Sequence, residues 1–159
     1  MRPLTLIVFV GTLALAWWLQ EPDPPADAAR LGPCRVLRVT DGDTVRVRCN
    51  GAAERVRLLQ IDTPERGEPL YEEAGRKLTA LIGDEPVWLE PWREKRDDHG
   101  RLLAYLFVGE RNLNLAMIEA GMSPYFERYG SGRYPREFAA AEDAAREARR
   151  GIWRNAGAR

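Results

Sequence analysis

Apolar and polar residues alternate in five stretches from residue 34 onward, and this pattern predicts five short strands. They are expected at residues 34–40, 43–49, 55–61, 86–91 and 102–108. Helical spacing of apolar residues predicts a first helix at 71–82. A second helix begins at a cap, Asn112 or Asn114, and ends at Gly121. A third begins at Pro135 and ends at Gly151.

The segments between these elements carry turn signals. Asp41-Gly42 and Asn50-Gly51 predict two-residue hairpin turns. Residues 93–99 are expected to form a charged loop, and residues 123–134 an ordered aromatic loop. One helix inserted after the third of five strands, with two helices at the end, suggests an α+β, mainly β fold. We therefore expect a five-stranded OB-fold barrel with three helices.

The N-terminal segment differs in composition from the remainder of the chain. Residues 3–20 carry no charge and are almost wholly apolar, which predicts a signal peptide or membrane anchor over residues 1–20. The pair Trp17-Trp18 favours a retained anchor, whereas Ala26-Asp27-Ala28 favours cleavage. A Pro-rich linker is expected over 21–33, followed by the folded domain over 34–155. Either fate of the segment predicts an extracytoplasmic protein, periplasmic or at the cell surface.

The chain has two cysteines, Cys34 and Cys49, one in each of the first two predicted strands. If Asp41 and Gly42 form the turn, Thr40 lies opposite Asp43 and the two cysteines lie opposite each other. In an oxidising compartment this register predicts a cross-strand disulfide. The alternative is a pair of free buried thiols, and a bulge in the hairpin would break the register argument.

Charge excludes a strongly basic nucleic-acid-binding protein. The 159 residues contain 24 basic and 24 acidic residues, and omitting residues 1–28 leaves 23 and 21. A nucleic-acid substrate would therefore have to be attracted by the local site rather than by the net charge.

Candidate chemistry gathers near predicted strand ends. Asp43 and Asp62, with a backbone carbonyl and waters, would make a hard oxygen site that suits Ca²⁺, and less well Mg²⁺ or Mn²⁺. Glu65, displaced by Pro64, is placed to accept a proton from water. Arg57 and Arg101 would bind phosphate oxygens. Together these residues indicate metal-assisted phosphodiester hydrolysis.

Each of these features also has a structural interpretation. Asp41-Gly42 is a common hairpin turn, and the residues from Asp62 to Glu65 are equally typical of a turn that opens a helix. Arg101, after Gly100, is compatible with a loop charge exposed to solvent. Their joint occurrence favours the catalytic interpretation.

Three motifs in order resemble the staphylococcal nuclease (thermonuclease, micrococcal nuclease) family. They are Asp41 to Val45, Arg57 to Glu65 and Gly100 to Tyr105, and the resemblance extends from about Arg35 to Trp153. It implies an OB-fold and a Ca²⁺-dependent endonuclease that acts on DNA and RNA and leaves 3′-phosphate ends.

The resemblance also implies roles for individual residues. It places Asp43, Asp62 and the Thr63 carbonyl on calcium, Glu65 as general base or water-orienting group, and Arg57 and Arg101 on the phosphate. His99, Tyr125 and Tyr129 are the loosely matching candidates for substrate contacts. His99, the one histidine of the sequence, stands where the family enzyme has a tyrosine near the nucleotide, and a solvated loop residue is the favoured alternative.

Two rival classes stay open at this point. One is a non-catalytic nucleic-acid-binding OB-fold module tethered to the envelope, and the other is an anchored envelope protein whose barrel serves protein contacts. The presence of Asp43, Arg57, Asp62, Glu65 and Arg101 favours the enzyme, which we expect to be a monomer.

Overall fold

The computed structural model describes residues 30–154, without the side chains of residues 93–95. The predicted signal or anchor over residues 1–20 lies outside this range. Within the described part of the chain, no helix combines the length and the apolar character needed to span a bilayer. The first strand begins at Leu31, inside the range predicted for the linker.

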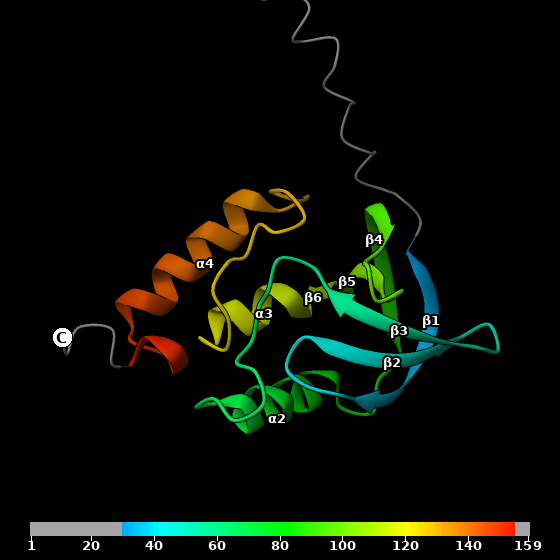
Figure 1. The fold of residues 1–159 in the computed structure, drawn as a ribbon, viewed down its shortest axis with the longest axis horizontal. Coiled ribbons are helices and arrows are strands. Elements are labelled where there is room, and N and C mark those ends of the chain that lie inside the picture. Colours follow the sequence, from blue (N-terminus) through cyan, green and yellow to red (C-terminus); the bar gives the residue numbers. More distant parts are fainter. Residues whose placement is uncertain (1–29, 155–159) are drawn as a thin grey trace, which may run out of the picture.

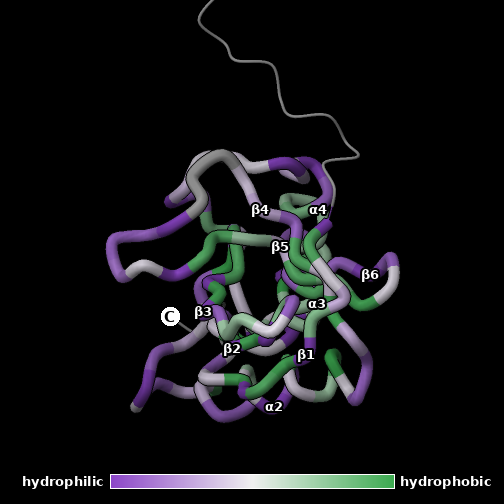
Figure 2. The backbone as a smooth tube through the Cα atoms, turned by 90° about the vertical axis from the view of Figure 1, so that its right-hand side faces the viewer, coloured by the Kyte–Doolittle hydropathy of each residue, from purple (hydrophilic) through white to green (hydrophobic). Residues whose placement is uncertain are grey.

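Five strands close into a mixed barrel (Figure 1). They are β1 (Leu31–Val39), β2 (Thr44–Cys49), β3 (Ala52–Leu58), β4 (Val87–Arg96) and β5 (Leu102–Val108). The order is β3-β2-β1-β4-β5, a parallel pairing of β3 with β5 closes the ring, and the two-residue β6 (Arg111–Asn112) adds to β5. Figure 2 shows hydrophobic segments toward the interior and hydrophilic ones in the outer loops. The predicted fold class is confirmed.

The β1–β2 hairpin has a longer turn than the sequence predicts. Thr40 donates its backbone N–H to the Thr44 carbonyl at 2.9 Å, so Thr40 lies opposite Thr44 and the predicted pairing with Asp43 is wrong. A bulge at Leu37 then shifts the register back by one residue. As a result Cys34 does lie opposite Cys49, with a Cα–Cα distance of 4.4 Å, and a disulfide joins them.

The third strand ends at Leu58, three residues earlier than predicted. Gln60 has a φ of 58°, so the chain leaves the strand there, although the Leu59 N–H still reaches the Ala104 carbonyl at 3.1 Å. Conversely, β4 continues to Arg96, into the predicted charged loop. Because β3 ends early, Arg57 is the second-last residue of the strand and Asp62 lies beyond the strand.

Three α-helices and a short 3₁₀-helix pack beside the barrel: α2 (Tyr71–Ile82), α3 (Leu113–Glu119), α4 (Pro135–Glu147) and η1 (Gly151–Trp153). Asn112 is the cap of α3, because its side chain accepts the Leu115 N–H at 3.2 Å. Asn114 is instead buried and bonds to backbone groups of Leu59 and Leu106. The helix α4 stops before the predicted Gly151, since Arg149 adopts a φ of 50°.

Candidate active site

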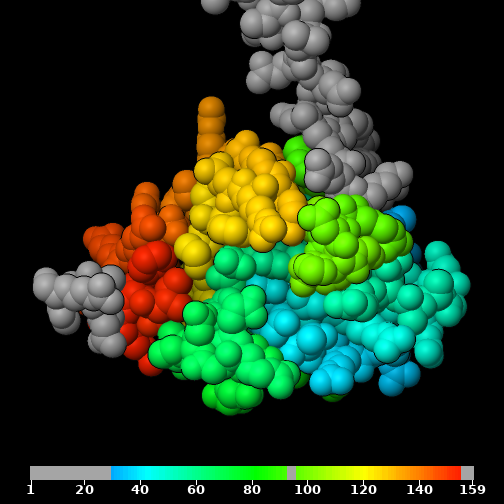
Figure 3. Space-filling model, in the orientation of Figure 1, coloured from blue at the N-terminus to red at the C-terminus, as the bar shows by residue number. Residues whose placement is uncertain are grey.

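The site lies where the β1–β2 turn, the end of β3 and the start of β5 meet. On the β-ladders Arg57 is paired with Thr44 of β2 and with Leu103 of β5. The turn that carries Asp43 and the turn that precedes Arg101 therefore flank Arg57 on its two sides. In Figure 3 the light green turn of residues 97–101 lies beside the yellow loop 123–134 on the visible face.

The buried Arg57 guanidinium joins the two predicted metal-binding aspartates. Its Nη1 donates to the carbonyls of Leu58 and Ile61, at 2.7 and 2.8 Å. Its Nη2 lies 2.9 Å from Asp62 Oδ1 and 3.3 Å from Asp43 Oδ2. Because both carboxylates contact one nitrogen, they lie close together, as the sequence predicted for a shared cation.

Asp43 is a buried carboxylate that fastens the hairpin turn to the segment after β3. Its Oδ2 accepts the backbone N–H and the hydroxyl of Thr63, at 3.0 and 3.1 Å. Its Oδ1 accepts the Thr44 hydroxyl at 3.1 Å. The preceding Gly42 leaves room for this contact, because a Cβ there would lie 2.7 Å from the Thr63 hydroxyl oxygen.

Asp62 is the more open of the two carboxylates, with 45% of its side chain exposed. Its backbone N–H donates to the Ser123 hydroxyl at 2.7 Å, which ties it to the loop before α4. Partial burial raises the pKa of Asp62, and the charge of Asp43 raises it further, against the lowering effect of Arg57. Burial and Asp43 also raise the pKa of Asp41, whose carboxylate accepts the Asp43 N–H.

Arg101 is held by Asp97 at the other side of the site. Its Nε donates to Asp97 Oδ2 at 2.7 Å, its backbone N–H to Oδ1 at 2.9 Å, and its Nη1 to the Thr44 hydroxyl at 3.3 Å. Burial would raise the pKa of Asp97, but the hydrogen bonds from Arg101 outweigh it and hold that pKa below its usual value. The Thr44 hydroxyl, which also contacts Asp43, links Arg101 to the aspartates.

Glu65 lies in the exposed loop between Asp62 and α2. Its backbone N–H donates to Glu68 Oε2 at 2.7 Å. Within residues 30–154 its carboxylate has no hydrogen-bond or ion-pair partner, so it is accessible to water. The structure thus gathers Asp43, Arg57 and Asp62 tightly, and Glu65 follows Asp62 by three residues with an exposed side chain.

The three candidates for substrate contacts lie in two separate loops. His99 is exposed, and its backbone N–H donates to Asp97. The Tyr125 hydroxyl donates to the Ser131 carbonyl at 2.7 Å, and burial together with Glu127 raises its pKa to about 12. Tyr129 packs partly against the core. Their contact with a substrate stays a prediction.

Sequence reasoning missed the residues that hold these groups in place, above all Asp97 and Ser123. For Asp97 a signal was present, because an Asx residue before a glycine-containing turn commonly bonds to the backbone a few residues on. For Ser123 there was none, since its partner Asp62 lies 61 residues earlier.

The oxygen ligands of the site suit a hard divalent cation. Asp43, Asp62 and the neighbouring Asp41 bring like charges together, and a cation would relieve their repulsion. Within the described part of the chain there is no cluster of three or more His, Cys, Asp or Glu side chains arranged to hold a metal. Any bound ion would therefore rely on two carboxylates, backbone oxygen and water.

Similarity to known proteins identifies the family of this chain. The family described as "Staphylococcal nuclease homologue" matches residues 55–155, more than half of the chain. The chain belongs to the staphylococcal nuclease family. An "Uncharacterized endonuclease" of Escherichia coli O157:H7 is 30% identical over 123 residues, with 77% of each chain covered. The range matched by the family model, residues 55–155, contains Arg57, Asp62, Glu65 and Arg101, whereas Asp43 precedes that range.

Two further family members differ in length. The "Thermonuclease" of Staphylococcus hyicus is 28% identical over 161 residues and covers 94% of this chain and 95% of its own. The "SPbeta prophage-derived endonuclease YokF" of Bacillus subtilis (strain 168) is 32% identical over 124 residues, or 73% of this chain. The chain spans only 42% of the length of YokF.

Proposed function

We propose that this chain is a Ca²⁺-dependent endonuclease that hydrolyses phosphodiester bonds of DNA and RNA and leaves 3′-phosphate ends. The observation that carries the proposal is the contact of one Arg57 nitrogen with both Asp43 and Asp62, beside a second guanidinium from Arg101. The names of the relatives, endonuclease and thermonuclease, support the same activity.

The metal would be held by Asp43, Asp62 and the Thr63 carbonyl. When bound, Ca²⁺ would supply positive charge beside the phosphate on which negative charge builds up. The roles of the side chains follow from their positions. Asp43 keeps its orientation through Thr44 and Thr63, and Asp62 through its backbone bond to Ser123.

Of the two arginines in the described chain, Arg101 is the one with an unoccupied Nη nitrogen for a phosphate oxygen. Its Nη2 has no partner within residues 30–154, whereas both nitrogens Nη1 and Nη2 of Arg57 already donate to protein oxygens. We therefore infer that Arg57 binds a phosphate oxygen by exchanging one of its carboxylate contacts for it. Charge-assisted bonds of this kind are about twice as strong as neutral ones.

Glu65 is proposed to accept a proton from the attacking water. Its exposed carboxylate, free of other partners within the described chain, meets the requirement of access to water. A positioned general base contributes roughly 10²–10⁴-fold to a rate. Glu65→Gln is thus expected to reduce kcat by at least that lower figure.

A plasmid-degradation assay tests the proposal. The wild type is expected to degrade DNA with Ca²⁺ and to stop with a chelator, and Glu65→Gln and Arg101→Ala are expected to lose most turnover. The matched control is Glu72→Gln, which replaces an exposed carboxylate on α2 and should retain full turnover. Full turnover in Glu65→Gln and Arg101→Ala would refute the assigned roles. Binding of DNA without cleavage by the wild type would point to the non-catalytic module instead.

The cellular setting is part of the proposal. The Cys34–Cys49 disulfide supports an oxidising, extracytoplasmic compartment, where such bonds persist. The anchor or signal over residues 1–20 and the monomeric state stay predictions. Alkylation of the isolated protein without reductant tests the disulfide, which predicts that neither cysteine is labelled.

A further inference from the structure

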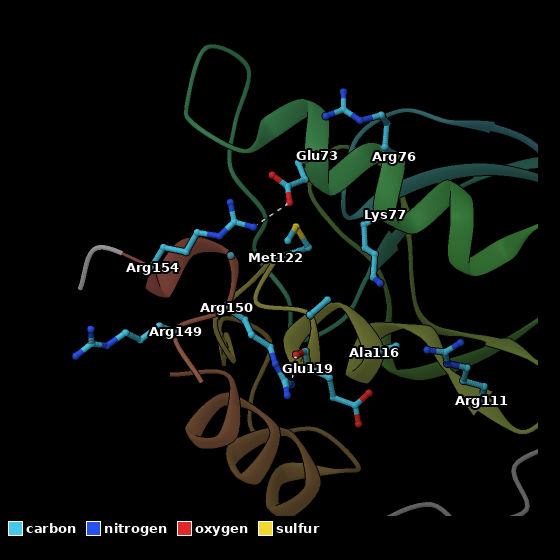
Figure 4. Close-up of a pocket in the computed structure, with 12 residues that line it drawn as sticks. Glu73, Arg76, Lys77, Arg111, Ala116, Glu119, Met122, Arg149, Arg150 and Arg154 are labelled. Carbon is cyan, nitrogen blue, oxygen red and sulfur yellow. Dashed lines mark hydrogen bonds and ion pairs between the residues drawn. The ribbon is translucent and has the colours of Figure 1, made fainter. Parts of the chain in front are cut away.

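A basic surface separate from the candidate active site lies between α2, α3 and the C-terminal segment (Figure 4). There a cavity of about 740 Å³ is lined by six cationic side chains from separate parts of the chain. They are Arg76, Lys77, Arg111, Arg149, Arg150 and Arg154. None of them belongs to the candidate active site, and we call this surface the basic groove.

Acidic residues neutralise the basic groove only in part. The two acidic residues that line it are Glu73, which lies 3.5 Å from Arg154 Nη2, and Glu119. Arg150 Nη1 donates to the backbone carbonyl of Glu119 at 2.8 Å, which leaves its charge uncompensated. Within residues 30–154 the side chains of Arg76, Lys77, Arg111 and Arg149 have no hydrogen-bond or ion-pair partner. Since the whole chain has no net charge, this excess of cations is a local feature.

Lys77 is the most informative of these groups. It projects from α2 into the groove, facing the side from which Arg111 reaches in from β6 (Figure 4). The residue is partly buried, as expected for a lysine whose methylene stem packs on the groove wall while its ammonium group stays available to a ligand. Cations that line one groove without carboxylate partners repel one another, and a bound anion would relieve that repulsion.

We propose that the basic groove binds the phosphodiester backbone of a nucleic acid outside the reaction site. The proposal rests on the proposed nuclease function for the identity of the polyanion. The groove lining contains no aromatic side chain on which bases could stack. Contacts limited to cations and phosphates position a strand without reading its sequence.

The groove connects to the candidate active site across α2. Glu73 and Arg76 line the groove and also a hollow of about 400 Å³ whose other residues include Arg66, Gly67 and Tyr71. Arg66 directly follows Glu65. The arginines of this hollow, Arg66 and Arg76, can contact a strand that passes from the active site to the groove, although Glu68 and Glu72 also line the hollow.

An anionic lipid surface fits the groove less well. A membrane contacts convex surfaces and usually engages apolar side chains as well. The cations here lie in a concavity, and the exposed large hydrophobic residues of the described chain, Leu31 and Leu37, are both on β1. Vesicle binding is therefore an alternative outcome of the test.

Salt-dependent binding of a 30-nucleotide single strand tests the proposal. Anisotropy is measured in chelator, and a gel confirms that the strand stays intact. The variant Lys77→Gln/Arg111→Gln/Arg149→Gln removes three groove charges from three segments. Each phosphate contact contributes roughly 0.7 to the slope of log K against log salt, so the slope should fall by roughly two units. Binding at low salt should weaken at least about tenfold.

Two further variants separate the groove from net charge and from folding. Arg35→Gln/Arg48→Gln/Arg136→Gln removes three exposed arginines elsewhere and should leave the slope unchanged. Lys77→Arg/Arg111→Lys/Arg149→Lys retains the groove charges and should bind as the wild type does. A tetranucleotide has few phosphates beyond those in the active site, so its cleavage should be nearly equal in all variants.

The outcomes distinguish this proposal from the proposed function. The groove proposal is overturned if the slope of log K against log salt is unchanged in the Lys77→Gln/Arg111→Gln/Arg149→Gln variant. It is also overturned if the Arg35→Gln/Arg48→Gln/Arg136→Gln variant loses as much affinity. Either result leaves the proposed function standing as long as the tetranucleotide is still cleaved. If the groove variant loses binding to vesicles with 30% phosphatidylserine but binds the oligonucleotide as the wild type does, the groove is a lipid site and the proposal is overturned. A wild type that binds through the groove but cleaves nothing refutes the nuclease and leaves the groove supported.

Discussion

The substitution Asp97→Asn tests whether Arg101 must be held in place to act. Asp97 has only 4% of its side chain exposed and accepts both the Arg101 Nε, at 2.7 Å, and the Arg101 N–H, at 2.9 Å. Asparagine has the same shape but no charge, and its amide nitrogen cannot accept a bond. Arg101 would thus lose one charge-assisted hydrogen bond of about 1.5–3 kcal/mol.

That loss sets the size of the expected effect. If the bond is needed for the reactive position of Arg101, about 1.5–3 kcal/mol corresponds to a decrease of roughly 10- to 150-fold in kcat/KM. The Arg101 guanidinium itself remains, so the decrease should be smaller than that of Arg101→Ala. Initial rates on a short oligonucleotide with saturating Ca²⁺ measure it, with urea unfolding as a check on stability.

Strand β3 offers a matched control in Glu54→Gln. Glu54 forms an ion pair of the same kind with Arg96, at 2.9 Å. Within residues 30–154 the Arg96 side chain contacts the turn of residues 97–101 only through the Gly100 carbonyl, at 2.8 Å, and Glu54→Gln leaves that donor in place. Glu54→Gln should therefore retain turnover. Equal turnover in wild type, Asp97→Asn and Glu54→Gln would show that Asp97 does not position a catalytic arginine.

Three other predictions concern the stability of the fold and of the site. Gly42→Ala should lower turnover and should lower stability by about 1–3 kcal/mol, because the added Cβ would displace Thr63. Gly75→Ala is the control: its Cβ would have only one atom within 4 Å, so the variant should be neutral or stabilised in urea unfolding. Asp62→Asn should abolish hydrolysis yet raise the free energy of unfolding at pH 7 in chelator. The raised pKa means that Asp62 stabilises the fold when protonated and that this contribution is lost as pH rises through the folded-state value. The gain should therefore shrink in an acid unfolding series, and a gain that grows with acidity would contradict this account. Cys34→Ser should cost about 3 kcal/mol of stability for a loop of 15 residues, and reductant should destabilise the wild type equally.

The fold class was predictable because it depends on patterns that each strand and helix carries locally. The disulfide pairing was also predicted, although its register argument was incomplete. The turn is one residue longer than Asp41-Gly42, and the bulge at Leu37 compensates for it. A bulge of this kind has no reliable signal in the residues, so the pairing was right at the cysteines and wrong at Thr40.

The end of β3 could not be predicted, because distant contacts determine it. Gln60 adopts a positive φ, which glutamine rarely does. Its side chain accepts the Tyr105 hydroxyl and donates to the Gly130 carbonyl at 3.0 Å. These partners lie 45 and 70 residues away, and they hold the chain in the turn that leads to Asp62.

The candidate site was predictable in its residues but not in its supports. Acidic and basic groups near strand ends indicated Asp43, Arg57, Asp62 and Arg101, and the structure brings them together. The contact of Arg57 with both aspartates, in contrast, follows from the packing of three strands. Sequence reasoning expected Arg57 to face the phosphate and did not foresee that its donors are already engaged.

We propose that Asp43 and Asp62 act as one cation site for hydrolysis beside the two arginines. The most direct test is the rate of DNA hydrolysis across a Ca²⁺ titration, in the wild type and in Asp43→Asn/Asp62→Asn. We predict a rate that rises to saturation with Ca²⁺ in the wild type and no Ca²⁺-dependent hydrolysis in the double variant. Undiminished, Ca²⁺-dependent hydrolysis by a folded double variant would contradict the account.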